Sequence, residues 1–365
     1  MPIPTMYHGR DNALRGVEEL FLLHPHVIMK TETTQHPHLN RRKFLQIVGV
    51  AGAAGAGWAL GLYRPGDHYK VVQKSQPMMG TILNLTLYGP EQSALEDAVE
   101  ATIQRMLTLE KYLSRHDRQS QIAKLNRTGL LPRPEQDVVN VLKLAEHIST
   151  ATEGAFDITV LPLLELQQNS TNPQQAAIAQ ALSLTGFQHV SIDQTAISLK
   201  YRGMGVTLDG IGKGYIVDQG VATLKENGFA TTYVEAGGDL MVSGKKPGNT
   251  LWRIGITPPR RKIREKMVVL ETCNRAVATS GDYMQAYDSS FSRHHIINPK
   301  TGYSPPELAS ATITAPTVAL ADGLATAAMV MGSKKTLALL NSIPECEGYL
   351  IDKSLKHYKS ANFSA

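Results

Sequence analysis

A glycine-rich turn between Gly205 and Gly214, GVTLDGIGKG, combines a short β-like run, a cation and the start of a helix. The run from Val206 to Leu208 is predicted as a strand. Apolar residues at spacings of four and three predict the helix that follows, with Gly228 as its left-handed cap. Such a turn presents backbone N–H groups at the positive end of a helix dipole, where a diphosphate can bind. The alternative is a turn that merely connects two elements.

Three phosphate-binding patterns compete for this turn. A Walker A loop needs Lys followed by Ser or Thr after its second glycine, and Ile211 stands there instead, which excludes that pattern. A Rossmann turn is a weaker alternative: Gly210 and Gly212 follow the predicted strand and Glu235 ends the next one, but Tyr215 occupies the third glycine position and is too large. The third pattern is a diphosphate site completed by residues from elsewhere in the chain.

Oxygen ligands recur near the C-terminus. Asp322 and Thr326 are four residues apart in a predicted helix from Ala319 to Met331, so they share one helical face and could bind a metal ion. The alternative is a capping carboxylate and a threonine bonded to its own backbone. His295 offers a titratable side chain, and on its own it could equally be a structural histidine.

The elements that must position these residues mix strands and helices without repeats, which predicts an α+β fold in one unit. Helices are predicted from Ser93 to Leu113 and from Val138 to Thr150, and a further strand is predicted from Ala311 to Ala315. A small-residue turn is predicted over 278–283, and a strand that ends in a tight turn over 294–303. The polar segment from Ser114 to Ser120 is a solvated loop or the rim of a ligand site.

Composition describes an ordinary globular protein: 365 residues, 42% hydrophobic and 19% charged. The net charge of +5 is concentrated near the N-terminus, where residues 1–65 hold seven Lys or Arg and four Asp or Glu. The remaining residues carry a net charge of only +2, so nothing indicates a nucleic-acid partner. Two cysteines, Cys273 and Cys346, leave one possible disulfide open.

The N-terminal residues 1–65 are predicted to be an extension and a twin-arginine signal peptide. Arg41-Arg42-Lys43 precedes an apolar, Gly/Ala-rich run that reaches Leu62, which is the pattern of a charged region followed by an apolar one. This predicts export to the bacterial periplasm, with an uncleaved membrane anchor as the alternative. Because Met29 would begin a signal of ordinary length, we expect the natural start there.

Seven ordered blocks between residues 70 and 350 resemble the ApbE family, the FAD:protein FMN transferases. The blocks are Met79-Gly80-Thr81, Gly154 to Thr159, Asp209 to Tyr215, Gly237-Gly238-Asp239, Thr279 to Asp282, His295 to Gly302 and Asp322 to Thr326. The resemblance implies one ApbE-like, T-fold-related α+β catalytic domain over residues 66–365 that binds FAD and Mg²⁺. It implies transfer of FMN from FAD to a Thr or Ser hydroxyl of a target protein, with release of AMP. The expected acceptor is a flavoprotein of an exported or membrane electron-transfer complex.

The resemblance also implies roles for individual residues. His295 would lie near the diphosphate and is the candidate base, and Asp322, Thr326 and the Gly210 carbonyl would bind the metal ion. The flavin nucleotide would contact Met79, Ala155, Phe156, Asp157 and Lys213.

Four positions depart from the family pattern, and one of them is Asn298, which stands where the family usually has aspartate. Thr207 stands where the family has aspartate and Asp209 where it has a small residue. On a strand, this two-residue shift would keep the acidic group on the same face. His116 replaces an aromatic residue of the first polar loop, which changes the group that stacks on the nucleotide. The competing function is a non-catalytic periplasmic flavin-binding or flavin-trafficking protein, or an FAD hydrolase, and the intact ligand, lysine and histidine positions favour the transferase.

Overall fold

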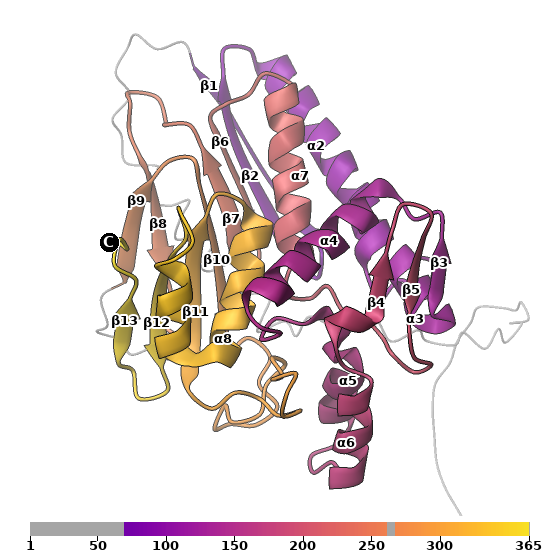
Figure 1. The fold of residues 1–365 in the computed structure, drawn as a ribbon. Coiled ribbons are helices and arrows are strands. Elements are labelled where there is room, and N and C mark those ends of the chain that lie inside the picture. Colours follow the sequence, from indigo (N-terminus) through magenta and orange to yellow (C-terminus); the bar gives the residue numbers. More distant parts are fainter. Residues whose placement is uncertain (1–68, 261–266, 365) are drawn as a thin grey trace, which may run out of the picture.

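An eight-stranded sheet forms the centre of the computed structural model, which describes residues 69–260 and 267–364 (Figure 1). Its strands lie in the order β1, β2, β6, β7, β10, β11, β12 and β13, and every neighbouring pair is antiparallel. Their bounds are β1 Lys70–Met78, β2 Thr81–Gly89, β6 Thr232–Ala236, β7 Asp239–Ser243, β10 Arg275–Gly281, β11 Leu308–Ala315, β12 Glu347–Asp352 and β13 His357–Lys359.

Three long helices, α2, α7 and α8, cover one face of this sheet (Figure 1). They and the neighbouring α4 have the bounds α2 Gln92–Leu113, α4 Gln136–Ala151, α7 Gly212–Glu226 and α8 Val318–Leu340. α2 buries one apolar stripe, which includes Leu95, Ile103 and Met106, as its amphipathic sequence predicts. α8 is buried on nearly all sides in its first half because α4 packs against it. The largest hydrophobic core lies between these helices and the sheet.

The opposite face of the sheet is covered by a hairpin of β8 (Trp252–Ile256) and β9 (Val268–Thr272). Burial alternates along β8, so Trp252, Ile254 and Ile256 point inward while the residues between them are exposed. Their side chains join Tyr88 and Phe363 in a second hydrophobic cluster. The central strands of the sheet are therefore covered on both faces.

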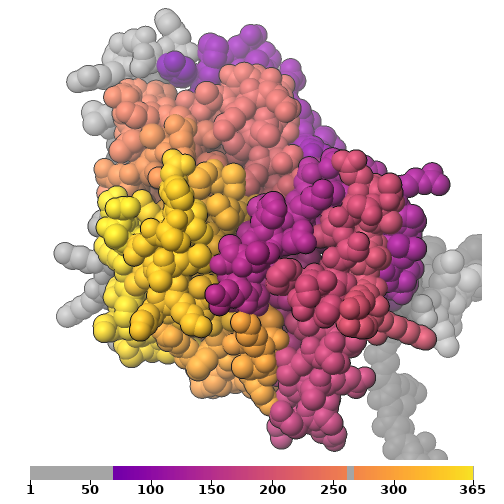
Figure 2. All heavy atoms as spheres, viewed as in Figure 1, coloured from indigo at the N-terminus to yellow at the C-terminus, as the bar shows by residue number. Residues whose placement is uncertain are grey.

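Smaller elements lie beside the large sheet. A three-stranded sheet in the order β3, β5, β4 packs with α3, and the α5–α6 pair projects at one end of the molecule (Figure 1). The surface of this pair adjoins that of the loop before β11 in Figure 2, and Ile297 of that loop packs against leucines of α5. The bounds are α3 Gln121–Thr128, β3 Leu130–Pro132, η1 Ile158–Val160, α5 Leu161–Asn169, α6 Gln175–Ser183, η2 Phe187–His189, β4 Val190–Ile192 and β5 Ala196–Leu199.

Two tight hairpin turns lie side by side at one end of the large sheet. Met79 and Gly80 form the β1–β2 turn, and Gly237 and Gly238 form the β6–β7 turn; all four have positive φ. The pairing of β2 with β6 places the turns together. Their closeness is shown by Gly237, where a Cβ atom would lie 3.0 Å from Thr81 Oγ1. Several predicted site residues gather at this end.

The mixed α+β architecture predicted from the sequence is confirmed. The helices predicted from Ser93, from Val138 and from Ala319 are present, as is the strand predicted from Ala311. α8 continues to Leu340, past a kink at Gly332.

Three local predictions were wrong. Val206 to Leu208 is not a strand: the Val206 backbone bonds to the side chain of Asn126, at 2.7 and 2.8 Å, and Thr207 N–H donates to the Ile158 carbonyl, so no neighbouring strand is needed. The small-residue turn was wrong for residues 278–281, which form the end of β10 in contact with α8, and right for Asp282 and Tyr283, which lie in the turn that follows.

The third wrong prediction is the strand from His294. In the part of the chain that the structure describes, this segment makes only an isolated bridge, between Ala286 and His294. The tight turn that follows it is confirmed, since Gly302 N–H donates to the Asn298 carbonyl at 2.9 Å.

The N-terminal extension and its predicted signal lie outside the described residues. Of the helices in residues 69–260 and 267–364, none is both long and apolar enough to span a bilayer. Cys273 and Cys346 are both free thiols in the structure.

Candidate functional site

The glycine turn joins an extended segment to the N-terminus of α7. Gly212 N–H donates to the Leu208 carbonyl at 2.6 Å, which closes the turn. A Cβ atom on Gly210 would lie 2.7 Å from Thr326 Oγ1 and 3.3 Å from the Phe156 ring. Only glycine therefore lets the backbone at this position lie against the threonine hydroxyl.

α7 and α8 cross in direct backbone contact beside this turn. A Cβ atom on Gly214 would lie 2.6 Å from the Val318 carbonyl oxygen, so a larger residue would separate the helices. Each helix also binds the N-terminus of the other: Gly214 N–H donates to Asp322 Oδ2 at 3.3 Å, and Val318 N–H donates to Asp218 Oδ1 at 2.8 Å. The crossing thus holds Asp322, and Thr326 one turn later, on the face of α8 that meets the glycine turn.

Lys213 lies between two buried carboxylates. Its Nζ is 2.9 Å from Asp239 Oδ2 and 3.9 Å from Asp322 Oδ2. Burial disfavours the charged form of Lys213, but the two carboxylates outweigh that effect and raise its pKa. Burial also raises the pKa of Asp322, and the negative charge of Asp239 adds to this, although Lys213 opposes both. Two carboxylates facing one ammonium leave a local excess of negative charge that a bound cation would neutralise.

The oxygen donors at this point fit a Mg²⁺ ion. Asp322 is 4% exposed. Thr326 Oγ1 lies 3.2 Å from Ser280 Oγ and packs against the backbone of Gly210. No group of three or more His, Cys, Asp or Glu side chains within the described ranges is placed to hold a metal ion. In proteins Mg²⁺ binds through one or two carboxylates and fills its other positions with water and substrate phosphate, and Asp322, Thr326 and the Gly210 backbone offer oxygen donors of that kind.

Arg115 ties the predicted ligand rim to the glycine turn. Its Nε and Nη2 both donate to Asp209 Oδ2, at 3.0 and 2.9 Å. Partial burial raises the pKa of Asp209, but the hydrogen bonds and charge of Arg115 outweigh it, and the net effect is a lowered pKa. The adjacent His116 is exposed at the same rim, and the buried Thr207 hydroxyl accepts a hydrogen bond from Asp209 N–H at 3.2 Å.

The predicted role of the displaced acidic group needs correction. Because Val206 to Leu208 is not a strand, Asp209 does not keep the strand face expected for it. Its carboxylate reaches the guanidinium of Arg115 instead, with 43% of the aspartate side chain exposed.

His295 lies on the loop between β10 and β11. Burial, and then the charge of the adjacent His294, lower the pKa of His295 to about 4. As smaller effects, the negative charge of Asp209 raises the pKa of His295 and the positive charge of Lys213 lowers it. Within the described residues its Nδ1 is buried and has no hydrogen-bond partner. A neutral imidazole in this position can accept a proton at neutral pH.

Met79 occupies the turn at the end of the sheet. Its φ of 52° lies in the left-handed region that residues other than glycine rarely adopt, and its N–H donates to Glu110 Oε1 at 2.9 Å. Such strain persists only where the surroundings enforce it, and it concentrates at functional sites. The turn lies beside the one that carries Asp239, whereas the predicted contact of Met79 with the flavin stays a prediction.

The segment from Ala155 to Asp157 is divided between two environments. Phe156 reaches the glycine turn, and Ala155 is partly exposed beside it. Asp157 instead caps η1: its carboxylate accepts hydrogen bonds from Thr159 N–H at 2.8 Å and from Phe187 N–H at 2.9 Å. A contact between Asp157 and the nucleotide therefore remains a prediction, and its bonds within the protein are structural.

Two residues of the site had no assigned role at the sequence level. Asp239 supplies the closest carboxylate to Lys213, and Arg115 supplies the cation at the rim. Each lies in a motif that the sequence singled out, the Gly237-Gly238-Asp239 turn and the polar segment after α2. The pairing partners come from distant parts of the chain, so neither pair could be identified from spacing.

Comparison with known proteins agrees with this geometry. Residues 79–350 match the model of the ApbE family. An FAD:protein FMN transferase from Vibrio cholerae is 30% identical over 305 residues, which cover 80% of this chain and 91% of that relative. Among solved structures, the flavin transferase ApbE from Vibrio cholerae has a TM-score of 0.71 at 27% identity, covering 81% of this chain and 98% of its own. An ApbE protein from Thermotoga maritima has a TM-score of 0.73 at 28% identity, with coverage of 80% and 98%.

Proposed function

The chain belongs to the ApbE family and is a flavin transferase, and we propose that it moves FMN from FAD to a Thr or Ser hydroxyl of a protein acceptor, with Mg²⁺ bound and AMP released. The observation that carries the proposal is the convergence of Gly210, Asp322 and Thr326 with Lys213 at the N-terminus of α7. Oxygen donors and a cation meet there, as a diphosphate substrate with its metal ion requires.

The bond changes are those of a phosphoryl transfer. The acceptor oxygen bonds to the phosphorus of the FMN half of FAD, the bond from that phosphorus to the bridging oxygen breaks, and AMP leaves with that oxygen. Mg²⁺ bound by Asp322, Thr326 and the Gly210 carbonyl would neutralise charge on the diphosphate. Lys213, held charged by Asp239 and Asp322, would stabilise the negative charge that develops on the phosphate oxygens.

His295 is the proposed base. The acceptor hydroxyl must lose a proton as its oxygen attacks, and His295 is neutral at physiological pH because burial lowers its pKa to about 4. Asp209 lies close enough to favour the imidazolium once the proton has moved, since its charge raises the pKa of His295. The exposed rim around Arg115 and His116 would contact the nucleotide.

The acceptor is proposed to be a flavoprotein of an exported or membrane electron-transfer complex, and the location is proposed to be the periplasm. Support comes from the family and from the Arg41-Arg42 motif before an apolar run. A flavin-binding protein or an FAD hydrolase would use the same pocket without an acceptor.

The test is covalent transfer of fluorescence. The protein is incubated with FAD, Mg²⁺ and a candidate acceptor, and acceptor-bound flavin is detected on a denaturing gel. We expect Asp322→Ala to abolish transfer and His295→Ala to lower kcat by at least about 100-fold, because a general base contributes roughly 10²–10⁴. EDTA should stop the reaction, and added Mg²⁺ should restore it.

His147→Ala is the matched control, because it removes an exposed histidine from α4 and should leave transfer unchanged. Circular dichroism confirms that each variant is folded. Near-normal transfer by a folded Asp322→Ala or His295→Ala variant would contradict the assignment. Production of free FMN without acceptor labelling would identify a hydrolase instead.

A further inference from the structure

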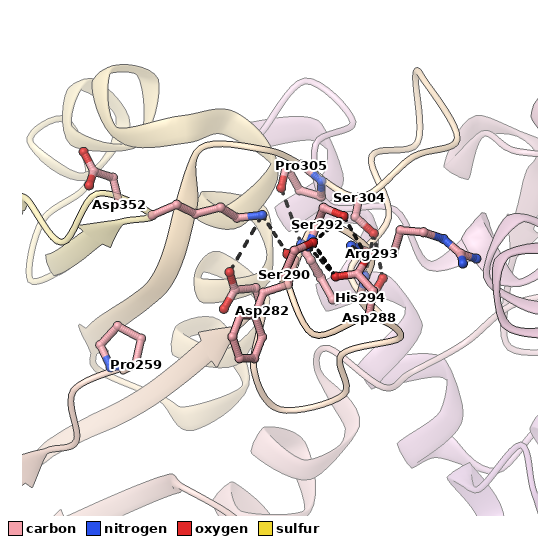
Figure 3. A network of polar contacts seen from close by, with 12 residues as sticks. Pro259, Asp282, Asp288, Ser290, Ser292, Arg293, His294, Ser304, Pro305 and Asp352 are labelled. Carbon is pink, nitrogen blue, oxygen red and sulfur yellow. Dashed lines mark hydrogen bonds and ion pairs between the residues drawn. The ribbon is translucent and has the colours of Figure 1, made fainter. Parts of the chain in front are cut away.

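A buried carboxylate, Asp282, follows β10 and lies outside the site described above (Figure 3). It is 0% exposed, and it accepts hydrogen bonds from Arg260 Nη1 and Nη2, both at 2.8 Å. Lys353 Nζ lies 3.8 Å away on the turn after β12. A buried charge is unfavourable unless it is paired, so two cations from separate segments are held at this point.

The loop that follows Asp282 is a hairpin that ends at His295. Its arms are joined by Tyr287 N–H to the Arg293 carbonyl at 2.8 Å and by His295 N–H to the Gln285 carbonyl at 3.1 Å. Its tip is closed by Asp288, whose carboxylate accepts hydrogen bonds from the Ser290 and Ser292 hydroxyls, both at 2.7 Å (Figure 3). Residues 285–295 therefore form one hydrogen-bonded unit.

The two cations that bind Asp282 also hold the tip of this hairpin. The Arg260 guanidinium lies 3.9 Å from the centre of the Phe291 ring, over its face. Lys353 Nζ donates to the Phe291 carbonyl at 2.8 Å. We call Asp282, Arg260, Lys353 and Phe291 the Asp282 clamp. The clamp contacts the hairpin at two points: Asp282 directly precedes its first arm, and Phe291 lies at its tip.

The imidazole of His295 is held only weakly: a hydrogen bond to the backbone of Gln285 raises its pKa, and Gln285 belongs to the same hairpin. Its Nδ1 is buried and makes no hydrogen bond to the described residues, whereas a working histidine is commonly oriented by a carboxylate or carbonyl on that nitrogen. The direction of the ring is thus determined by the backbone that carries it. That backbone is the hairpin held by the clamp.

We propose that the Asp282 clamp positions His295 for flavin transfer, with Asp282 as a positioning residue that touches neither substrate nor metal. The inference rests on the proposed function, because it requires His295 to be the base. The clamp acts by fixing the hairpin relative to the end of β10, whose Ser280 contacts Thr326 of the site.

The test is Asp282→Asn in the full chain, which keeps the shape of the side chain and removes its charge. We expect kcat for FMN transfer to fall at least tenfold while KM for FAD changes less than threefold, since the glycine turn and α8 remain in place. The acid limb of kcat/KM should move upward from near pH 4 toward 6.5 as water reaches the imidazole. Hydrogen exchange of the amides of residues 285–295 should become at least tenfold faster.

Two further variants keep the test decisive. Glu271→Gln is the control. It removes the carboxylate of an exposed ion pair on the β8–β9 hairpin, in which Arg253 Nε lies 3.3 Å from Glu271 Oε1, and it should leave kcat, the pH profile and the exchange rates unchanged. Lys353→Met leaves the Arg260–Asp282 bonds intact and removes the two interactions of Lys353, with Asp282 and with the Phe291 carbonyl. The Lys353→Met variant serves in place of Asp282→Asn if the latter does not fold. It should lower kcat, raise the pH of the acid limb and speed hydrogen exchange in the same directions, but by smaller amounts.

Unchanged kcat and unchanged exchange in a folded variant would overturn the proposal. So would a lowered melting temperature with kcat and the pH profile of the folded fraction unchanged, because the clamp would then be only structural. If the wild-type protein itself transfers no flavin, the proposed function fails first, and the exchange rates alone decide whether the clamp holds the hairpin.

Discussion

At the scale of single residues, His295 combines three properties that rarely occur together. It is buried, its Nδ1 lacks a hydrogen-bond partner in the described chain, and it lies within the influence of both Lys213 and Asp209. Burial favours the neutral ring, so the imidazole is unprotonated and can accept a proton at any pH well above 4. This distinguishes it from a surface histidine, which would be half protonated near pH 6.5.

The pH profile of the enzyme follows from this burial. We expect kcat/KM to stay nearly constant down to about pH 5 and to fall as the pH passes about 4, because protonation removes the base. In the unfolded chain the same group titrates near 6.5, so the unfolded state binds more protons between those values. The contribution of His295 to stability is therefore lost as the pH falls from about 6.5 toward 4.

Initial rates over that range, with circular dichroism at each pH to exclude unfolding, check the expectation. An acid limb near pH 6.5 in the folded enzyme would show that the imidazole is hydrated or is not the base.

At the scale of elements, the crossing of α7 and α8 assembles most of the site. Asp322 of α8 binds the N-terminus of α7, and Asp218 of α7 accepts hydrogen bonds from the Val318 and Ala319 N–H groups of α8. The carboxylates satisfy N–H groups that a helix cannot satisfy internally. The two helices thereby fix each other's position, and the glycine turn is held against α8.

Gly214→Ala should break this arrangement. Its Cβ atom would lie 2.6 Å from the Val318 carbonyl oxygen, which belongs to backbone and cannot rotate away. We expect a loss of roughly 1–3 kcal/mol in the free energy of unfolding, as for other overpacked sites, and a loss of Mg²⁺-dependent transfer. Urea unfolding and the fluorescence assay measure the two effects.

Gly212→Ala is the matched control on the same helix. The nearest atom to its Cβ would be the Leu208 Cβ at 3.2 Å, a contact that a small shift relieves. Equal stability and activity of Gly214→Ala and the wild type would show that the helices can separate without displacing Asp322.

At the scale of the whole molecule, the antiparallel sheet brings turns from distant parts of the chain to one end. The β1–β2 turn, which holds Met79, and the β6–β7 turn, which precedes Asp239, meet there because β2 pairs with β6. Each turn is short, so the side chains next to it are held closely. The α5–α6 pair and the loop before β11 are added to this framework (Figure 1).

Export of the whole chain is a prediction that concerns residues outside the described ranges. Replacement of Arg41 and Arg42 together by lysine should abolish delivery to the periplasm, because the twin-arginine pair is read by its receptor as an address. The measurement is cell fractionation followed by immunodetection. The same replacement at Arg64, after the apolar run, is the control and should leave export intact; periplasmic delivery of the Arg41/Arg42 variant would exclude the twin-arginine route.

The sequence by itself determined the α+β class, the long helices and most of the residues of the site. Periodicity was sufficient for α2 and α4 because the pattern of burial repeats every turn of a helix, and α8 was predicted from its apolar composition. Periodicity was insufficient for Val206 to Leu208, where apolar β-like residues pair with the Asn126 side chain instead of a strand. The small residues of β10 resembled a turn in the sequence. In the structure they lie against α8, a contact that spacing along the chain does not show.

Only the tertiary structure decided which charges meet. The pairs Lys213 with Asp239 and Arg115 with Asp209, and the clamp of Asp282 with Arg260 and Lys353, all join segments far apart in sequence. Spacing along the chain reports neighbours on one helix or strand and carries no information about contacts between elements. The motifs could therefore identify Lys213 and His295, whereas their partners, and the low pKa of that histidine, depend on how the sheet and helices pack.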